Sequence, residues 1–129
     1  SFKESDSSSS SDSGNGSMVS YAMQFLGNRY VWGGTSLTNG TDCSGFTMGI
    51  YRHFGISIPR TSAAQASASR SVKSSEVRPG DLFFYGSGHV SHVAMYIGGG
   101  KIIHASNARD GIKISNAYYR KPLKIGRFS

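Results

Sequence analysis

The spacing of apolar residues changes partway along the chain, and this change restricts the possible folds more than any other feature. In the segment 17–27, apolar residues recur at the intervals of one helix face, with Ser17 placed as N-cap and Gly27 just past the end. From residue 82 onward, short runs rich in β-branched and aromatic residues are separated by glycine and polar turns. Helices followed by antiparallel strands predict an α+β domain. The apolar positions of the first helix are Met18, Ala22, Phe25 and Leu26.

Two more helices are expected before the strands. Turn-forming residues at 39–42 precede Cys43, and helical spacing then continues to Gly55, whose type is common just past a helix C-terminus. The segment 61–69 predicts a short helix capped by Thr61 or Ser62. The expected strands are 82–85, 91–97, 101–105, 111–114 and 123–128.

The first sixteen residues differ in composition from the rest of the chain. They contain eight serines and three acids, but only one large apolar residue, Phe2. Such a segment buries too little apolar surface to offset the entropy of ordering it, so we expect a flexible linker at 1–16 and one domain at 17–129. Because a serine-rich linker usually joins two modules, we expect this domain to be the C-terminal module of a longer protein. No apolar run approaches the roughly 18 residues of a membrane span.

The domain is strongly basic. Residues 17–129 hold thirteen Lys or Arg against four acids, a balance of +9. This charge favours polyanionic surroundings such as a cell wall, an anionic membrane or nucleic acid. Nucleic-acid binding is disfavoured, because the bases are dispersed and do not alternate with aromatic residues.

The only cysteine of the chain, Cys43, lies at the expected start of a helix. The free N–H groups and partial positive charge of a helix N-terminus stabilise a thiolate, and they are able to hold the oxyanion that forms when sulfur attacks a carbonyl. A small buried cysteine in a core is the alternative, and position alone leaves both open. One cysteine excludes an internal disulfide and disfavours a cysteine-based zinc site. No joint metal site is expected from His89 and His92 either, because residues three apart on a strand point to opposite faces.

Two histidines fall on neighbouring expected strands. If Gly98 to Gly100 form a three-residue hairpin loop, Ala94 faces His104, and His92 lies on the same face as His104. A two-residue loop would shift the register and separate the two imidazoles. We expect the three-residue loop, with the histidines turned toward the start of the Cys43 helix; the alternative is that His104 is an ordinary polar residue on a half-exposed strand. The opposite, core-facing side would carry Val93, Met95 and Ile103.

Six short motifs follow one another in an order that is found in one enzyme family. They are YVWGG, TDCSGF, IPRTSAAQ, RPGDLFFY, SHVAMYIGGG and IIHAS. Through them, the stretch from Ser17 to Phe128 resembles the NlpC-type cell-wall cysteine peptidases. The resemblance implies a papain-like α+β fold, with N-terminal helices packed on an antiparallel sheet of about five strands. It also implies Cys43 as nucleophile, His92 as base and His104 as the third, orienting residue.

The same resemblance implies a reaction and a setting. The expected activity is that of a cysteine endopeptidase that hydrolyses the D-γ-glutamyl–diamino acid bond of peptidoglycan stem peptides, without a metal or organic cofactor. The expected partners are stem peptides and anionic wall polymer, with no nucleic acid and no membrane insertion, for a monomer that is secreted or associated with the bacterial wall. Two rival interpretations are a wall-binding module without catalysis and a Cys-His amidase that cuts the sugar–peptide bond.

Further site positions follow from the resemblance alone. The Tyr30 hydroxyl is placed near the thiolate or the oxyanion. Asp42 and Ser62 match positions that, in some members, bind the free N-terminal amine of the substrate, although a helix N-cap explains Asp42 equally well. Arg60 is expected either to pair with a stem-peptide carboxylate or to lie on the surface. Asp81 is interpreted as structural.

Overall fold

The computed structural model describes residues 16–128, so the expected linker at 1–16 lies outside the described residues except for Gly16. The helix expected from Cys43 is confirmed, and so is the following short helix with Thr61 as its N-cap. The helices of the described part are α1 (Gly16–Met23), α2 (Cys43–His53) and α3 (Ser62–Ala68), followed by the short 3-10 helix η2 (Ser74–Glu76).

Helix α1 is shorter than expected. It ends at Met23, turns carry the chain on to Gly27, and Leu26 is exposed instead of facing the core. Gly27 has a φ of 88°, and its N–H donates to the Ile112 carbonyl at 2.9 Å. The bond to this distant strand ends the helix early, because it draws the backbone out of the helical path.

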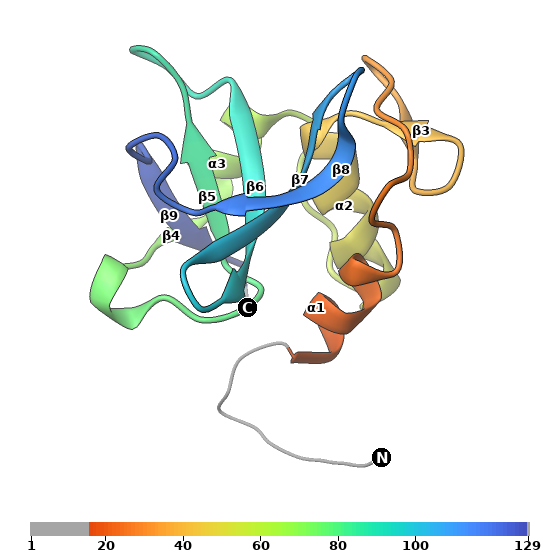
Figure 1. The fold of residues 1–129 in the computed structure, drawn as a ribbon. Helices are drawn as coiled ribbons and strands as arrows, with labels where there is room; N and C mark the ends of the chain where they lie inside the picture. The colour runs from red at the N-terminus through yellow and green to blue at the C-terminus, as the bar shows by residue number, and fades with distance from the viewer. Residues whose placement is uncertain (1–15, 129) are drawn as a thin grey trace.

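An antiparallel six-stranded sheet forms the other half of the molecule, in the order β4-β9-β5-β6-β7-β8 (Figure 1). All five expected strands are present, and they differ from the expected ranges by at most two residues at an end. The sequence did not predict β4 (Arg70–Ser71), nor the separate pair β2 (Thr35–Ser36) and β3 (Gly40–Thr41), because strands of two residues are too short to show a period. The five expected strands are β5 (Leu82–Tyr85), β6 (His92–Gly98), β7 (Lys101–Asn107), β8 (Gly111–Asn116) and β9 (Lys124–Arg127).

The β6–β7 hairpin differs from expectation in its loop, although its inner register is as expected. Gly98 pairs with Lys101, so the loop has two residues, Gly99 and Gly100, both with positive φ (61° and 77°) as a tight hairpin turn requires. The ladder then shifts between Tyr96 and Gly98, which leaves one extra residue on β6. This bulge restores the register that a three-residue loop would have produced. Beyond it, Met95 pairs with Ile103, and one step further places Ala94 opposite His104.

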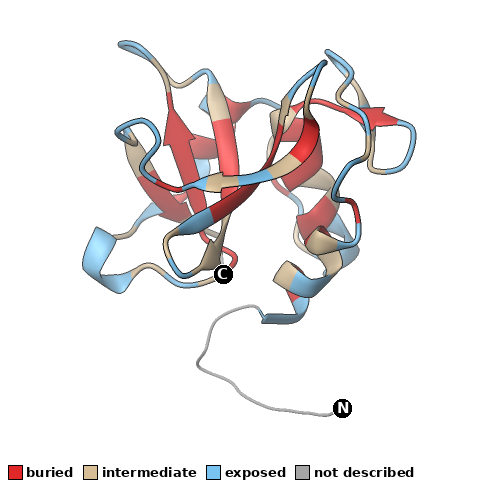
Figure 2. Ribbon diagram, viewed as in Figure 1, coloured by how far each residue is buried: buried red, intermediate tan, exposed pale blue. Residues whose placement is uncertain are grey.

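The helices cover one face of the sheet, and the main core lies between them (Figures 1 and 2). As expected, Val93, Met95 and Ile103 are fully buried on this face, where they pack in one cluster with Phe46 and Ile50 of α2. A smaller buried cluster lies on the other face of the sheet. Its members are Phe83, Tyr85, Ala94, Ile102, Ala117 and Ile125.

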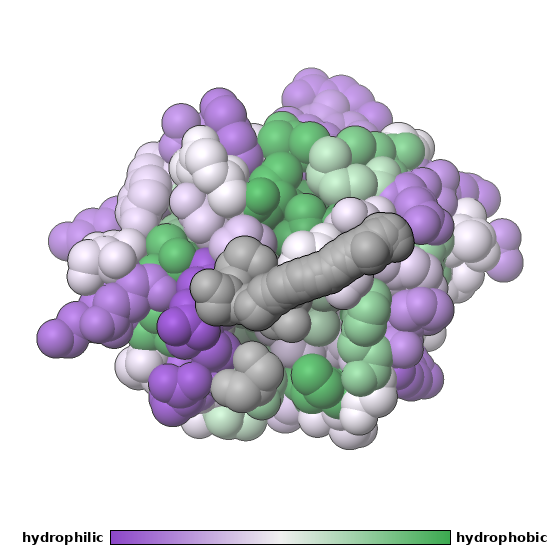
Figure 3. All heavy atoms as spheres, turned by 90° about the horizontal axis from the view of Figure 1, so that it is seen from below, coloured by the Kyte–Doolittle hydropathy of each residue, from purple (hydrophilic) through white to green (hydrophobic). Residues whose placement is uncertain are grey.

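The outer surface is mixed in character. On the face that carries α1, seen from below, apolar residues lie in separate patches between hydrophilic ones (Figure 3). None of the helices within residues 16–128 is long and apolar enough to cross a membrane.

Candidate active site

The first turn of α2 is capped by the residue before the cysteine. Asp42 has an extended backbone (φ −91°, ψ −176°), and its Oδ1 accepts from the Gly45 N–H at 2.8 Å. Its Oδ2 accepts from the Gly33 N–H at 3.2 Å. The N-cap interpretation of Asp42 is therefore confirmed, and Cys43 stands as the first residue of the helix, where backbone N–H groups lack helical partners.

The start of α2 lies against the preceding loop with almost no space between them. A Cβ on Gly45 would collide with the Gly34 carbonyl, and a Cβ on Gly34 would in turn collide with the Gly40 carbonyl. Glycine is needed at both positions because backbone meets backbone there.

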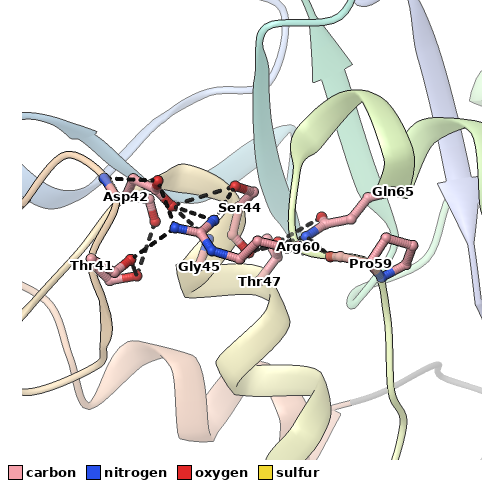
Figure 4. Close-up of polar contacts among 10 residues, drawn as sticks. Thr41, Asp42, Ser44, Gly45, Thr47, Pro59, Arg60 and Gln65 are labelled. Atoms are coloured by element: carbon pink, nitrogen blue, oxygen red, sulfur yellow. Dashed lines mark hydrogen bonds and ion pairs between the residues drawn. The ribbon is translucent and has the colours of Figure 1, made fainter.

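Arg60 contacts the same carboxylate. Its Nη1 lies 3.1 Å from Oδ1 of Asp42, and its Nη2 lies 3.0 Å from Oδ2 (Figure 4). Nη1 also donates to the Ser44 hydroxyl at 2.9 Å. Arg60 is thus engaged in an ion pair within the chain, which neither of its two expectations included, while 37% of its side chain remains exposed.

A buried amide connects α2 to α3, and the sequence did not single it out. Gln65 is fully buried, and its Nε2 donates to the carbonyls of Ser44 (3.0 Å) and Pro59 (2.8 Å). Its Oε1 accepts from the Thr47 hydroxyl at 2.8 Å (Figure 4). These bonds fix the segment that carries Arg60 against the first turn of α2. The only signal in the sequence was a glutamine within a short helix that is otherwise built of small residues.

The Cys43 sulfur lies in a half-buried position beside the start of β6. Burial raises the pKa of the thiol, and the Asp42 carboxylate raises it further. The backbone N–H groups of Val93, Ser44 and Cys43 itself act in the opposite direction. The helix start therefore favours the thiolate as expected, but the cost of desolvation outweighs it.

The two histidines share one face of the sheet, as expected. Nε2 of His92 lies 2.7 Å from Nδ1 of His104, and Nε2 of His104 lies 2.9 Å from the Ser115 hydroxyl. Burial lowers the pKa of His92 to about 4, with a further contribution from Arg120. Burial, followed by the charges of His92 and Lys113, lowers the pKa of His104 to about 3. Both imidazoles are uncharged at neutral pH.

The two histidines and the body of α2 lie on different faces of the sheet. The body of α2 packs on the opposite face, the one that carries Val93 and Met95, while His92 sits beside Tyr85 with ring centroids 6.1 Å apart. The Cys43 thiol, at the first residue of α2, meets the start of β6 beside the Val93 N–H, and the expected approach of the sulfur to the histidines stays a prediction.

The remaining positions lie as follows. Tyr30 is half-buried, and its pKa is raised by burial and then by the nearby Cys43 and Asp42. Ser62 is buried at the first position of α3. His53, in the last turn of α2, stacks on Tyr21 with ring centroids 3.7 Å apart. His89 is exposed in the loop before β6, and among residues 16–128 no three His, Cys, Asp or Glu side chains form a group that could hold a metal ion.

Known proteins resemble this chain in both sequence and structure. A family model described as the NlpC/P60 family matches residues 27–125. The probable endopeptidase p60 of Listeria innocua is 43% identical over 103 residues, which cover 78% of this chain and 21% of that protein. The gamma-D-glutamyl-L-lysine dipeptidyl-peptidase of Bacillus cereus is 44% identical over 101 residues, which cover 75% of this chain and 30% of that protein. The chain thus spans less than a third of the length of these relatives.

Among solved structures, the NlpC/p60 domain of the peptidoglycan hydrolase SagA superimposes with a TM-score of 0.79 at 36% identity. The match covers 88% of this chain and 99% of that domain. The papain-like α+β fold expected from the motifs is confirmed. Since the family model spans most of the chain and the relatives agree with it, the chain belongs to the NlpC/P60 family.

Proposed function

We propose that this domain is a cysteine peptidase that hydrolyses peptidoglycan stem peptides at the D-γ-glutamyl–diamino acid bond. The printed names of its relatives, an endopeptidase and a gamma-D-glutamyl-L-lysine dipeptidyl-peptidase, support the reaction class. One observation carries the proposal. The only thiol of the chain, at the first residue of α2, meets the start of β6, where His92 begins a hydrogen-bonded chain to His104.

In this proposal Cys43 is the nucleophile, His92 the general base and His104 the orienting residue. For Nδ1 of His92 to take the thiol proton, its Nε2 must carry the hydrogen that is donated to Nδ1 of His104. His104 then carries its own hydrogen on Nε2, from which it donates to the Ser115 hydroxyl. The two hydrogen bonds are consistent with one direction of donation, from His92 through His104 to Ser115. A neutral imidazole stabilises the His92 cation less strongly than a carboxylate would.

The reacting groups start as an uncharged pair. The pKa of Cys43 is raised by burial and that of His92 is lowered by burial to about 4, so the thiol and the imidazole are both neutral at pH 7. The thiol proton passes to His92 as the sulfur attacks the amide carbonyl, and backbone N–H groups at the start of α2 hold the oxyanion. His92 then protonates the leaving amine, and water hydrolyses the thioester.

Three side chains are proposed to receive the substrate. Tyr30 contributes its hydroxyl near the oxyanion, and Ser62 together with Asp42 receives the amino end of the stem peptide. A contact between Arg60 and a stem-peptide carboxylate would have to compete with Asp42 and Ser44, which already share its guanidinium. The basic surface fits a substrate embedded in anionic wall polymer, and we propose that the domain acts there as a secreted or wall-associated monomeric module.

Digestion of defined muropeptides, with mass-spectrometric identification of the new amine, tests the proposal. We expect a free amino group on the diamino acid with the wild-type protein and no product with Cys43→Ala at equal folded content. Release of the whole stem peptide from the sugar would identify an amidase instead. Binding to walls without any product would identify a non-catalytic module.

A further inference from the structure

The residue that caps α2 also creates an electrostatic problem for the neighbouring thiol. The carboxylate of Asp42 precedes Cys43 directly, and a negative charge at that position opposes loss of the thiol proton. The same carboxylate is needed as a hydrogen-bond acceptor, because it caps the helix by accepting from the N–H groups of Gly45 and Gly33. For ionisation of the thiol, the hydrogen-bonding capacity of Asp42 is useful, whereas its charge is unfavourable.

Arg60 is placed to resolve this conflict. Its two terminal nitrogens contact one carboxylate oxygen each, at 3.1 and 3.0 Å, in the paired geometry that guanidinium and carboxylate groups prefer. We propose that Arg60 is a positioning residue for Cys43 that acts through Asp42. Its guanidinium compensates the charge of the carboxylate and holds it in its capping orientation, so that a thiolate forms beside a neutral ion pair. The inference rests on the proposed role of Cys43 as nucleophile.

The other ionisable groups around this helix start are few. Tyr30 from the preceding loop is close enough to Cys43 and Asp42 for their charges to raise its pKa. The strands packed against α2 bring His92 and Tyr96 on β6 and Lys101 and His104 on β7. Both histidines are uncharged at neutral pH, and Tyr96 and Lys101 lie toward the β6–β7 hairpin loop, away from the start of β6. Neither β2 nor α3 carries an ionisable side chain, and α1 contributes Tyr21 at the far end of α2, stacked on His53. Among these neighbours, only Arg60 brings a permanent positive charge to the Asp42 carboxylate.

A second Arg–Asp pair in the same domain provides a matched control. Arg127 contacts Asp81 with Nε at 2.8 Å and Nη2 at 2.8 Å, and the pair links β9 to the residue before β5. Asp81 adjoins Leu82, at the end of β5 away from Tyr85, the residue that pairs with His92. This pair resembles Asp42–Arg60 in geometry but lies away from the thiol.

The rate at which iodoacetamide alkylates the folded protein, followed by mass spectrometry as a function of pH, measures the thiol directly, because Cys43 is the only cysteine. We expect Arg60→Gln to slow alkylation at pH 7 about tenfold, which corresponds to an upward shift of the apparent pKa by about one unit. Arg60→Lys, which keeps the positive charge, should slow alkylation less than Arg60→Gln does. Asp42→Asn, which keeps a capping side chain but lacks the charge, should alkylate faster than wild type.

The double variant Asp42→Asn with Arg60→Gln separates charge compensation from simple support of the fold. It should return to within about threefold of the wild-type rate, because the uncompensated charge is gone while the cap remains. Arg127→Gln should leave the profile unchanged. If that variant does not fold, Arg109→Gln, which breaks an exposed pair with Asp110, serves as the control.

Several results would overturn the inference. They are an unchanged alkylation profile in Arg60→Gln, a double variant as slow as Arg60→Gln, or an Asp42→Asn protein no faster than wild type. If Arg60→Gln fails to fold, the alkylation rate of Asp42→Asn relative to wild type still tests the inference. A wild-type protein whose Cys43 alkylates as expected but which cleaves no stem peptide would contradict the proposed function and leave this inference standing.

Discussion

The two halves of the candidate site are held in different ways. On the thiol side, Asp42, Arg60 and Gln65 form many short bonds to side chains and to backbone, and these bonds tie α2 to its preceding loop and to α3. On the imidazole side, the polar contacts are a linear chain of two bonds, from His92 to His104 to Ser115, beside the buried ring of Tyr85 and the exposed ring of Tyr119. The proposed nucleophile is therefore held by a branched polar network, and the proposed base by its place on a strand of the sheet. Loss of the buried Gln65 bonds should mainly affect stability, and loss of an imidazole should mainly affect chemistry.

Replacing the base gives the largest expected effect. His92→Ala should lower hydrolysis of stem peptides by about a thousandfold or more, because a positioned general base contributes roughly 10² to 10⁴ in rate. The fold should be retained. His89→Ala is the matched control, since that imidazole is exposed and lies three residues earlier, in the loop before β6. Equal losses in the two variants would contradict the assignment of His92.

Gln65→Leu tests the thiol half. The substitution leaves the Ser44 and Pro59 carbonyls and the Thr47 hydroxyl without their buried partner, which should cost about 3 kcal/mol of unfolding free energy. Urea denaturation of the variant and the wild type measures this difference in unfolding free energy. Gln24→Leu, at an exposed position, should change the free energy by less than about 0.5 kcal/mol. A Gln65→Leu protein as stable as the wild type would show that the network does not hold this half together.

Acid should destabilise the imidazole half first. The pKa of His92 is lowered to about 4 and that of His104 to about 3, whereas both titrate near 6.5 in an unfolded chain. The unfolded state therefore takes up protons first as the pH falls. The stability contributed by these neutral histidines is fully present above about pH 6.5 and declines toward pH 4. Melting temperatures between pH 7 and 4 should fall less steeply in His104→Asn, and parallel curves would rule out this contribution.

His104→Asn should be much milder than His92→Ala. An asparagine is still able to exchange a hydrogen bond with Nε2 of His92, so we expect a loss of about tenfold, most of it in kcat. His104→Ala, which removes the hydrogen-bond partner of His92, should lower activity further. An asparagine variant as inactive as His92→Ala would mean that the division of roles between the two histidines is wrong.

The smallest effect is expected from the hairpin loop. In a hairpin with a three-residue loop and no bulge, loss of one glycine from 98–100 would flip the strand that carries His104. The bulge between Tyr96 and Gly98 changes this expectation. Without Gly99, Ile97 is free to pair with Lys101 across a two-residue loop, and the ladder from Tyr96 inward keeps its register. The deletion variant should therefore retain activity within about twofold, and a complete loss of hydrolysis would show that the ladder has slipped.

The regular elements and the position of Cys43 at a helix start were predictable from the sequence because both follow local patterns. Helical spacing after Cys43 and alternation around His92 are visible in short windows, and both elements formed. The bulge in β6 and the two-residue strands were not predicted, because they are set by pairing with a partner strand and leave no pattern in the local sequence. The ion pair between Arg60 and Asp42 was not predicted for the same reason, since 18 residues separate the two in the sequence. The raised pKa of the Cys43 thiol was not predicted either, because the helix start is readable from sequence and the depth of burial is not.

The contact of Gly45 and Gly34 limits how this domain is able to vary. The nucleophile rests on a surface where the smallest possible side-chain addition already collides with backbone, so no substitution at either position shifts the helix start by a small, useful amount. A library that seeks new cleavage preferences gains nothing from randomising these two codons and loses folded members by doing so. Diversity is better introduced in the side chains around the proposed site, while the backbone-to-backbone contact at the start of α2 is kept unchanged.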